Sequence, residues 1–511
     1  MSRSTLAIPL SLTVLGTCVW LLSRGDAVRA PAGSVTGTTA NSAELMVFCA
    51  ASNRSVAEAI RKRYEAETGR RVQFQYGPSQ ALLSQLQLTQ AGDLFLPADD
   101  SYLELARQKG LTAEVLPLGQ MRCGLAVPKG NPRGIRNLAD LFSGDLRVVQ
   151  ASPESAAVGR LAREALQPLG LWDSLHAATD AYRTTVGDVA NDVKVGAADV
   201  GLVFDAVLTP FPDLEFIAVP QLESAVAQVS VAVTSFTAQP AAALHFARYL
   251  AAGDRGLEEY QRQGFVAAEG DPWADVPELT LYAGSMLRPA IEETLVEFEQ
   301  REGVRISRTY NGCGILVAQM KAGQHPDAYF ACDVEFMKQM QELFPNPVNV
   351  SENELVILVH KGNPKKIASL QDLTEPGLRV GIGHEKQCAM GWITQKTFTE
   401  SGLKTQLMQN VTVQTPTGDM LVNQLRTGSL DAAVAYLSNA AGAADFLDAV
   451  QIQGIPCAVA VQPWAVSEKT KYPRLAGRLF DQIRSAESQE IFAAEGFRWQ
   501  MSAPVSGDHP R

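Results

Sequence analysis

Four short segments in the first half of the chain combine small and hydroxylated residues where a strand is expected to pass into a helix. They are Ala50-Ala51-Ser52-Asn53, Gly77-Pro78-Ser79-Gln80, Pro153-Glu154-Ser155-Ala156-Ala157 and Thr184-Thr185-Val186-Gly187. Hydroxyl groups and the free N–H groups of a helix's first turn, aided by the helix dipole, suit a tetrahedral oxyanion. Since Ser at the start of a helix is also an ordinary cap, no single loop identifies a ligand.

The composition is that of a globular protein large enough for more than one domain. The chain has 511 residues, 46% of them hydrophobic and 19% charged, and single cores stop growing near ~250–300 residues. The formal net charge is −11, and no run of Lys and Arg is long enough to follow a phosphate backbone. Nucleic acid is therefore not expected as a partner. One site can still be electropositive within a negative protein, so the net charge does not argue against an anion.

The chain is a duplicated unit. Glu44 aligns with Glu278, and the alignment runs without a gap to Asp99 and Asp333. After a small shift the agreement resumes, with Lys129-Gly130-Asn131-Pro132 matching Lys361-Gly362-Asn363-Pro364. Internal repetition of this length indicates two domains of one kind. We expect a first domain at 44–267, a linker rich in Gly, Pro, Asp and Ala at 268–277, a second domain at 278–500 and a tail at 501–511.

Each unit alternates strand and helix signals. In the first unit, apolar runs such as Leu45 to Phe48 and Val200 to Phe204 indicate strands, and periodic stretches such as Val56 to Thr68 and Ala157 to Leu166 indicate helices. Strands separated by helices predict α/β domains with parallel sheets that are covered on both faces. Ligands of such sheets bind beyond the carboxyl ends of the strands, where the helix N-termini point.

The N-terminus has the pattern of an export signal. Met1-Ser2-Arg3 is positively charged, Leu6 to Leu22 is apolar, and Ser23 to Asp26 is polar, which indicates a signal peptide or an uncleaved signal anchor. Together with a small and polar tether, this segment would occupy residues 1–43. The pattern predicts a periplasmic or other extracytoplasmic location, with the apolar segment as a membrane anchor if it is retained.

The order of motifs resembles the periplasmic molybdate-binding proteins of ABC importers. The first unit contains YGPSQALLSQL, DLFLPADDSYL, AVPKGNP and ADVGLVF, and the second contains YNGCGILVAQM, DAYFACD, LVHKGNP and GSLDAAVAY. The resemblance covers nearly all of residues 44–500. It implies two tandem periplasmic-binding-protein-like domains of type II, each with two α/β lobes, two crossover strands and a ligand cleft between the lobes.

Carried over by position, the resemblance implies a site of neutral donors. In the first unit these are the hydroxyls of Ser52 and Ser79 and the N–H groups of Ala157 and Val186. Phe204 stands where the family often has a Tyr, so one donor is missing. In the second unit the corresponding residues are Ser285, Cys313, Ala389, Gly418 and Tyr436. Because Ser285 aligns with Ala51, the assignment of Ser52 can shift by one residue.

Two thiols bring different chemistry to the second unit. Cys313 takes the place of Ser79, and Cys388 lies in the loop that should provide an N–H, with His384 close in sequence. A thiol is a poor donor to a hard oxyanion. Three interpretations stay open: the two thiols form a disulfide, they bind a soft metal, or they are small buried residues. We expect Cys332 and Cys457 to be structural.

A pair of arginines also occupies equivalent positions. Arg54 and Arg288 each lie at the start of the first helix of their unit. Each could face the anion, although an Arg in such a position more often pairs with a nearby carboxylate.

The sequence predicts an extracytoplasmic solute-binding protein that captures a tetrahedral oxyanion, molybdate or tungstate, and presents it to the permease of an ABC importer. We expect a monomer with no cofactor. Enzymatic activity is not expected, because the four loops of the first unit contain no His and no paired carboxylates. Alternatives are a sensor or scavenger that serves no importer, a different cargo such as sulfate, and a soft metal held by the thiols of the second domain.

Overall fold

The computed structural model describes residues 44–501. The predictions for residues 1–43, including the export segment, and for the tail beyond residue 501 lie outside the described residues. Within the described part of the chain, none of the helices combines the length and apolar character that crossing a membrane requires.

The first domain is built on one sheet in the order β2-β1-β3-β9-β4-β7-β5-β6, with β8 and β10 also paired to β4. Its strands are β1 (Leu45–Ala50), β2 (Val72–Gly77), β3 (Leu94–Leu96), β4 (Thr112–Pro128), β5 (Val148–Ala151), β6 (Thr179–Arg183), β7 (Val200–Phe204), β8 (Leu214–Ile217), β9 (Val226–Thr234) and β10 (Val266–Ala267).

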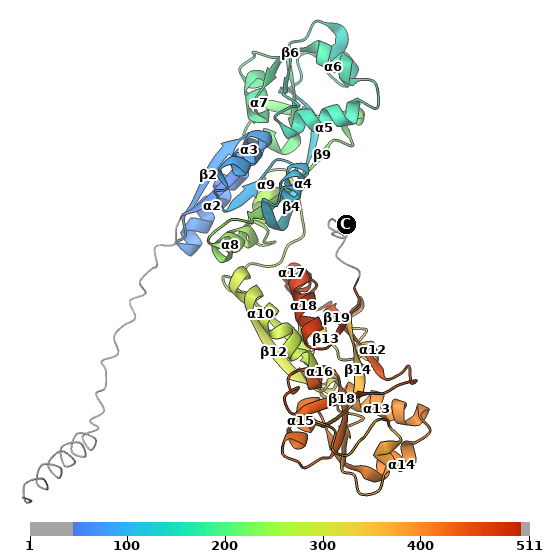
Figure 1. The fold of residues 1–511 in the computed structure, drawn as a ribbon. Helices are drawn as coiled ribbons and strands as arrows, with labels where there is room; N and C mark the ends of the chain where they lie inside the picture. Colours follow the sequence, from blue (N-terminus) through green and yellow to red (C-terminus); the bar gives the residue numbers. More distant parts are fainter. Residues whose placement is uncertain (1–43, 502–511) are drawn as a thin grey trace, which may run out of the picture. The chain divides into compact units, whose positions relative to one another are not determined.

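Two groups of helices surround this sheet and define two lobes. Figure 1 shows α5, α6 and α7 around β6, and α2, α3, α4, α8 and α9 around the other end of the domain. The helices are α2 (Arg54–Thr68), α3 (Ser79–Thr89), α4 (Ser101–Gln108), α5 (Ala157–Leu166), α6 (Trp172–Ala178), α7 (Val186–Lys194), α8 (Pro240–Leu250) and α9 (Gly256–Arg262).

The local signals explain most of these elements. The helix α2 ends where Gly69 adopts a left-handed conformation with φ of 71°, which costs glycine little. The apolar strands β3 and β7 are buried along their whole length, as expected for strands covered on both faces.

The expected parallel pairing holds within each lobe but not between the lobes. The strand β1 pairs in parallel with β2 and β3, and β5 pairs in parallel with β6 and β7. However, β4 and β9 run antiparallel to each other, and β4 is also antiparallel to β7. The strand β4 is long enough to take part in both lobes, and together with β9 it joins them. They take the place of the two crossover strands that the family resemblance implied, although the alternation of strand and helix signals alone did not reveal them.

The second domain repeats this topology in the order β12-β11-β13-β19-β14-β17-β15-β16, with β18 and β20 paired to β14. Its strands are β11 (Glu278–Gly284), β12 (Arg305–Asn311), β13 (Ala328–Phe330), β14 (Val348–His360), β15 (Val380–Gly383), β16 (Val411–Thr415), β17 (Ala432–Tyr436), β18 (Leu447–Gln451), β19 (Val459–Val466) and β20 (Arg498–Trp499).

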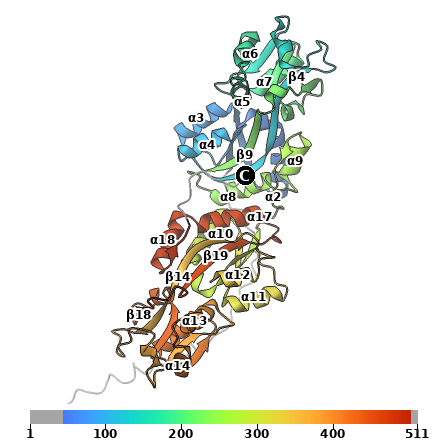
Figure 2. The same ribbon diagram turned by 90° about the vertical axis from the view of Figure 1, so that its right-hand side faces the viewer.

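The helices of the second domain again fall into two groups. Figure 2 shows α13 and α14 in one lobe, and α10, α11, α12, α17 and α18 in the other. The helices are α10 (Arg288–Glu302), α11 (Cys313–Lys321), α12 (Val334–Lys338), α13 (Ala389–Glu400), α14 (Lys404–Asn410), α15 (Gly418–Arg426), α16 (Ser438–Ala441), α17 (Pro473–Ile483) and α18 (Ala486–Ala494). Each domain has its own hydrophobic core, which confirms the expectation of two tandem α/β domains.

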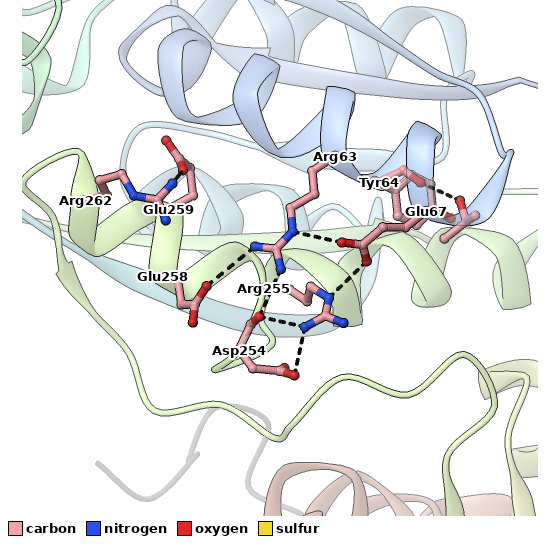
Figure 3. A network of polar contacts seen from close by, with 9 residues as sticks. Arg63, Tyr64, Glu67, Asp254, Arg255, Glu258, Glu259 and Arg262 are labelled. Atoms are coloured by element: carbon pink, nitrogen blue, oxygen red, sulfur yellow. Dashed lines mark hydrogen bonds and ion pairs between the residues drawn. The ribbon is translucent and has the colours of Figure 1, made fainter.

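A polar network joins α2 to the segment before α9 on the surface of the first domain. Figure 3 shows Arg63 and Arg255 both reaching Glu67, with N–O distances of 2.9 and 3.0 Å. Arg63 also lies 3.5 Å from Glu258. These side chains are about one quarter to one half exposed. Since water and salt screen such pairs, we expect each to contribute no more than about 1 kcal/mol.

A buried histidine of α8 links α2 to the segment that follows α9. Nδ1 of His245 lies 2.8 Å from the Tyr64 hydroxyl, and its Nε2 lies 2.8 Å from Oδ1 of Asp275. A neutral imidazole satisfies both contacts if Nε2 donates to the carboxylate and Nδ1 accepts from the hydroxyl. Burial lowers the pKa of His245 to about 4, and the hydrogen bond to Asp275 opposes that shift only in part.

The depressed pKa of His245 predicts a stability that depends on pH. The neutral form is favoured in the folded state, so stability is fully present above the ordinary histidine pKa near ~6.5. It falls as the pH drops from there towards the folded pKa of about 4, because only the unfolded chain takes up the proton. We expect the loss to be about 2–3 kcal/mol.

Urea unfolding at pH 7.5 and pH 4.5 measures this effect, since the wild-type protein should lose more stability than His245→Gln. His176→Gln, in the other lobe, is the matched control and should behave like wild type. Equal losses in all three proteins would contradict the assignment.

Candidate functional site

The four predicted loops of the first domain converge on one small cavity of about 20 Å³. It lies between the two lobes, beyond the carboxyl ends of β1, β2, β5 and β6. Its lining contains no charged side chain and consists of Ala50, Ala51, Ser52, Gly77, Pro78, Ser79, Ala98, Ala156, Ala157, Val158, Thr185, Val186 and Phe204. Every residue proposed for ligand binding in this domain is among them.

The positions of these residues follow from where the helices begin. Ser79, Ala157 and Val186 are the first residues of α3, α5 and α7. Ser52 lies in the single turn of 3₁₀-helix, Ala51–Asn53, that precedes α2. The N–H groups of a first turn have no partner within their own helix, and the helix dipole makes that end positive. Four such ends around an uncharged cavity provide a positive potential without a cation.

The two serines differ in their hydrogen bonding. Ser79 is buried, and its Oγ accepts the backbone N–H of Ala98 at 3.0 Å, so its own hydroxyl hydrogen remains to be donated. Oγ of Ser52 is a buried atom and has no partner among the described residues. Buried polar atoms without a partner are rare and often mark a ligand position.

A larger hollow of about 470 Å³ adjoins the cavity and shares Ala51, Ser52, Gly77 and Thr185 with it. Arg54 lines this hollow, and its guanidinium lies 4.4 Å from the centre of the Tyr76 ring. Arg288 stacks in the same way on Tyr310. The alternative in which each Arg pairs with a carboxylate is not what the structure shows, because both make cation–π contacts instead.

The first cleft is closed, and contacts between the lobes hold it. The N–H of Gln80 in α3 donates to the carbonyl of Ser155 at 3.4 Å. Arg160 of α5 forms an ion pair with Asp99 at 3.0 Å, and both side chains are largely buried. Its guanidinium also lies 4.5 Å from the centre of the Tyr102 ring. Asp99 is itself held in place, because its Oδ2 accepts the N–H of Gln228.

The corresponding residues of the second domain occupy equivalent places. Cys313, Ala389 and Gly418 begin α11, α13 and α15. Ser285 begins the 3₁₀ turn before α10, and Tyr436 ends β17. The N–H of Gly314 donates to Gln387 across the lobes at 3.0 Å, so this cleft is closed as well. The Tyr436 hydroxyl is buried and has no partner in the described part of the chain.

Cys313, Cys332 and Cys388 are free and buried in the second domain, and Cys313 lies nearer to Cys332 than to Cys388. Sγ of Cys313 lies 2.7 Å from Sγ of Cys332, whereas Sγ of Cys388 lies near the carbonyls of His384 and Thr415 at 3.6 and 3.7 Å. A disulfide between Cys313 and Cys388 is therefore not the geometry observed. Within residues 44–501, no group of three or more His, Cys, Asp and Glu side chains is placed to hold a metal ion.

Sequence reasoning missed two features of these clefts. The ion pair between Arg160 and Asp99 joins residues from different lobes, and no local pattern connects them. Cys332 was grouped with the structural cysteines, although the repeat aligns it with Ala98, the residue whose N–H contacts Ser79. The repeat alignment could have indicated its place beside Cys313 once the first site was known.

Comparison with known proteins assigns both domains of the chain to one family. A model of the family described as bacterial extracellular solute-binding protein matches the chain twice, over residues 45–266 and 279–498. The molybdate-binding protein ModA of Mycobacterium tuberculosis is 30% identical over 230 residues, which are 44% of this chain and 86% of that protein. ModA of Escherichia coli is 29% identical over 178 residues, 33% of this chain and 68% of that protein.

The periplasmic molybdate-binding protein of Azotobacter vinelandii is 22% identical, covers 44% of this chain and 100% of its own, and gives a TM-score of 0.38.

The ion pair between Arg160 and Asp99 predicts how readily the first cleft opens. In Arg160→Met the closed form loses about 1–2 kcal/mol, so the amide of Gln80, which is protected by its bond across the cleft, should exchange about 5- to 30-fold faster. Hydrogen exchange of the ligand-free protein measures this rate.

Arg163→Met is the matched control, because Arg163 pairs with the mostly exposed Glu154 on its own lobe. The amide of Gly314 in the second domain should be unaffected in both variants. An unchanged rate at Gln80 in Arg160→Met would show that this ion pair does not control closure.

Proposed function

Because this chain belongs to the bacterial extracellular solute-binding protein family, we propose that its first domain captures a tetrahedral oxyanion, molybdate or tungstate, outside the cytoplasm. The captured ion passes to the permease of an ABC importer in the cytoplasmic membrane. The relatives named as molybdate-binding proteins support this choice of cargo.

One observation supports the proposal above the others. The cavity of the first domain is lined by helix starts and two serines, and it contains no charged side chain. An anion taken out of water there gains hydrogen bonds from fixed neutral donors, and such bonds are stronger where water is excluded. A cation would meet the positive ends of the helices and is disfavoured. The site is therefore selective for negative charge.

We expect the site to distinguish molybdate and tungstate from sulfate by the size of the anion. Sulfate has the same charge as molybdate and offers the same four oxygens, but it is a smaller tetrahedron. Donors held by rigid helix starts cannot follow a smaller ion inward, so sulfate should leave some hydrogen bonds unmade. An unmade bond to a charged group is costly in a buried site.

The same features argue for transport and against catalysis. The cavity lining offers no nucleophile with a neighbouring base and no carboxylate pair. Two lobes joined by the strands β4 and β9 can open and close about a bound ion, which is what delivery requires. A sensor or scavenger would use the same motion, and dependence of cellular molybdate uptake on this protein and its permease distinguishes the two roles.

Calorimetric titration of the purified chain with molybdate, tungstate and sulfate tests the proposal. We expect tight binding of molybdate and tungstate at the first domain and weaker binding of sulfate. Ser79→Ala removes one hydroxyl donor to a charged group, which is worth about 1.5–3 kcal/mol, so affinity should fall about 10- to 100-fold.

Ser84→Ala is the matched control, since Ser84 lies on the exposed face of the same helix and should leave the affinity unchanged. If none of the three oxyanions produced heat, the proposed cargo would be wrong. Equal affinity in the Ser79 and Ser84 variants would place the site elsewhere.

A further inference from the structure

The second cleft has sulfur where the first has oxygen or a methyl group. The repeat aligns four residues of the first cavity with sulfur-containing residues of the second domain. These pairs are Ser52 and Met286, Ser79 and Cys313, Ala98 and Cys332, and Ala156 and Cys388. All four sulfur-bearing residues are buried. The two domains thus share the same backbone fold, while the side chains at these four positions differ in carrying sulfur in the second domain.

Two of these changes occur at residues that touch each other. In the first domain the N–H of Ala98 donates to Oγ of Ser79 at 3.0 Å. In the second domain the N–H of Cys332 donates to Sγ of Cys313 at the same distance of 3.0 Å. The backbone contact is therefore preserved. What is new is the side chain of Cys332, whose Sγ lies 2.7 Å from Sγ of Cys313.

A third change provides the space for this second sulfur. Gly284 aligns with Ala50 of the first domain. A Cβ atom added to Gly284 would lie 2.0 Å from Sγ of Cys332 and 3.3 Å from Sγ of Cys313. The methyl group found at Ala50 could not coexist with the thiol of Cys332. Three contacting positions thus differ together, in the way required to seat two sulfurs side by side.

We propose that Cys313 and Cys332 form a disulfide in the wall of the second cleft, at the position of the first domain's ligand-binding serine. The two S–H bonds break and one S–S bond forms. The two electrons and two protons pass to an oxidised protein dithiol of the thiol-oxidising class, whose own disulfide is reduced to two thiols. The availability of this oxidant rests on the extracytoplasmic location proposed above.

The neighbouring groups identify Cys332, rather than Cys388, as the partner of Cys313. Sγ of Cys388 is directed towards the backbone carbonyls of His384 and Thr415 in its own lobe, which is not the lobe of Cys313. Cys388 has its own glycine neighbour, since a Cβ at Gly383 would lie 2.8 Å from its Sγ. It therefore remains a separate free thiol in the cleft.

Burial determines when the bond can form. Contact with Cys313 and burial raise the pKa of the Cys332 thiol well above its usual range, and the thiolate is the form that reacts. Exchange in the folded protein should therefore be slow. The bond forms during folding, before the two residues are enclosed. Once formed, it removes the S–H of Cys313 from the cleft, so the second cleft presents a different surface in its oxidised and reduced forms.

Refolding of the full chain from denaturant in mixtures of oxidised and reduced glutathione tests the proposal. After alkylation of free thiols, peptide mass spectrometry should find Cys313 linked to Cys332, with the loss of two hydrogens. Cys332→Ala, which restores the residue of the first domain, should leave Cys313 alkylated. Cys388→Ala and the control Cys457→Ser should keep the link. Alkylation of both Cys313 and Cys332 in every mixture, or a link from Cys313 to Cys388, would overturn the proposal.

Thermal unfolding gives a second readout that does not depend on peptide recovery. The oxidised protein should unfold about 5–10 °C higher than the reduced protein in the transition of the second domain, and Cys332→Ala should abolish this difference. An equal midpoint in both redox states would also contradict the disulfide. Neither measurement uses an oxyanion, so failure here leaves the titration of the first domain unaffected, and failure of that titration leaves the link intact.

Discussion

Under the proposed function the first domain buries an anion without a counter-cation, which requires several fixed dipoles that point at the same small volume. A helix start is the densest source of unpaired N–H groups in a protein. Parallel strands bring such starts together, because successive carboxyl ends lie along one edge of the sheet. The pairs β1 with β2 and β5 with β6 do this once in each lobe. The cavity of the first domain lies where these two edges meet.

The strands that join the two lobes allow a closed cleft to open again. A site enclosed on all sides could not load or release its cargo, whereas two lobes connected by β4 and β9 can separate as units. Closure then depends on a few contacts between the lobes, chiefly the ion pair of Arg160 with Asp99 in the first domain. In the second domain the repeat aligns Trp392 with Arg160, so its closure uses different side chains. The two clefts therefore need not open with equal ease.

The two copies of the repeat share one fold but differ in the side chains at their clefts. The hydrogen bond between the residues that follow β3 and begin α3 recurs in the second copy at the same length, although oxygen is replaced by sulfur. Glycines at 284 and 383 provide the room that the added sulfurs need. Substitutions that compensate one another in this way preserve packing density. They indicate that the second cleft has a chemistry of its own rather than a weakened version of the first.

The sequence alone predicted the two tandem α/β domains and the four loops that meet at the first cavity. These depend on local periodicity, on turn residues such as Gly69, and on a repeat that can be read without coordinates. Tertiary structure decided the rest. The antiparallel pairing of the joining strands, the contact of Arg160 with Asp99 and the proximity of Cys313 to Cys332 rather than Cys388 all involve residues distant in sequence. Such contacts depend on how separate elements pack, and no local pattern specifies that packing.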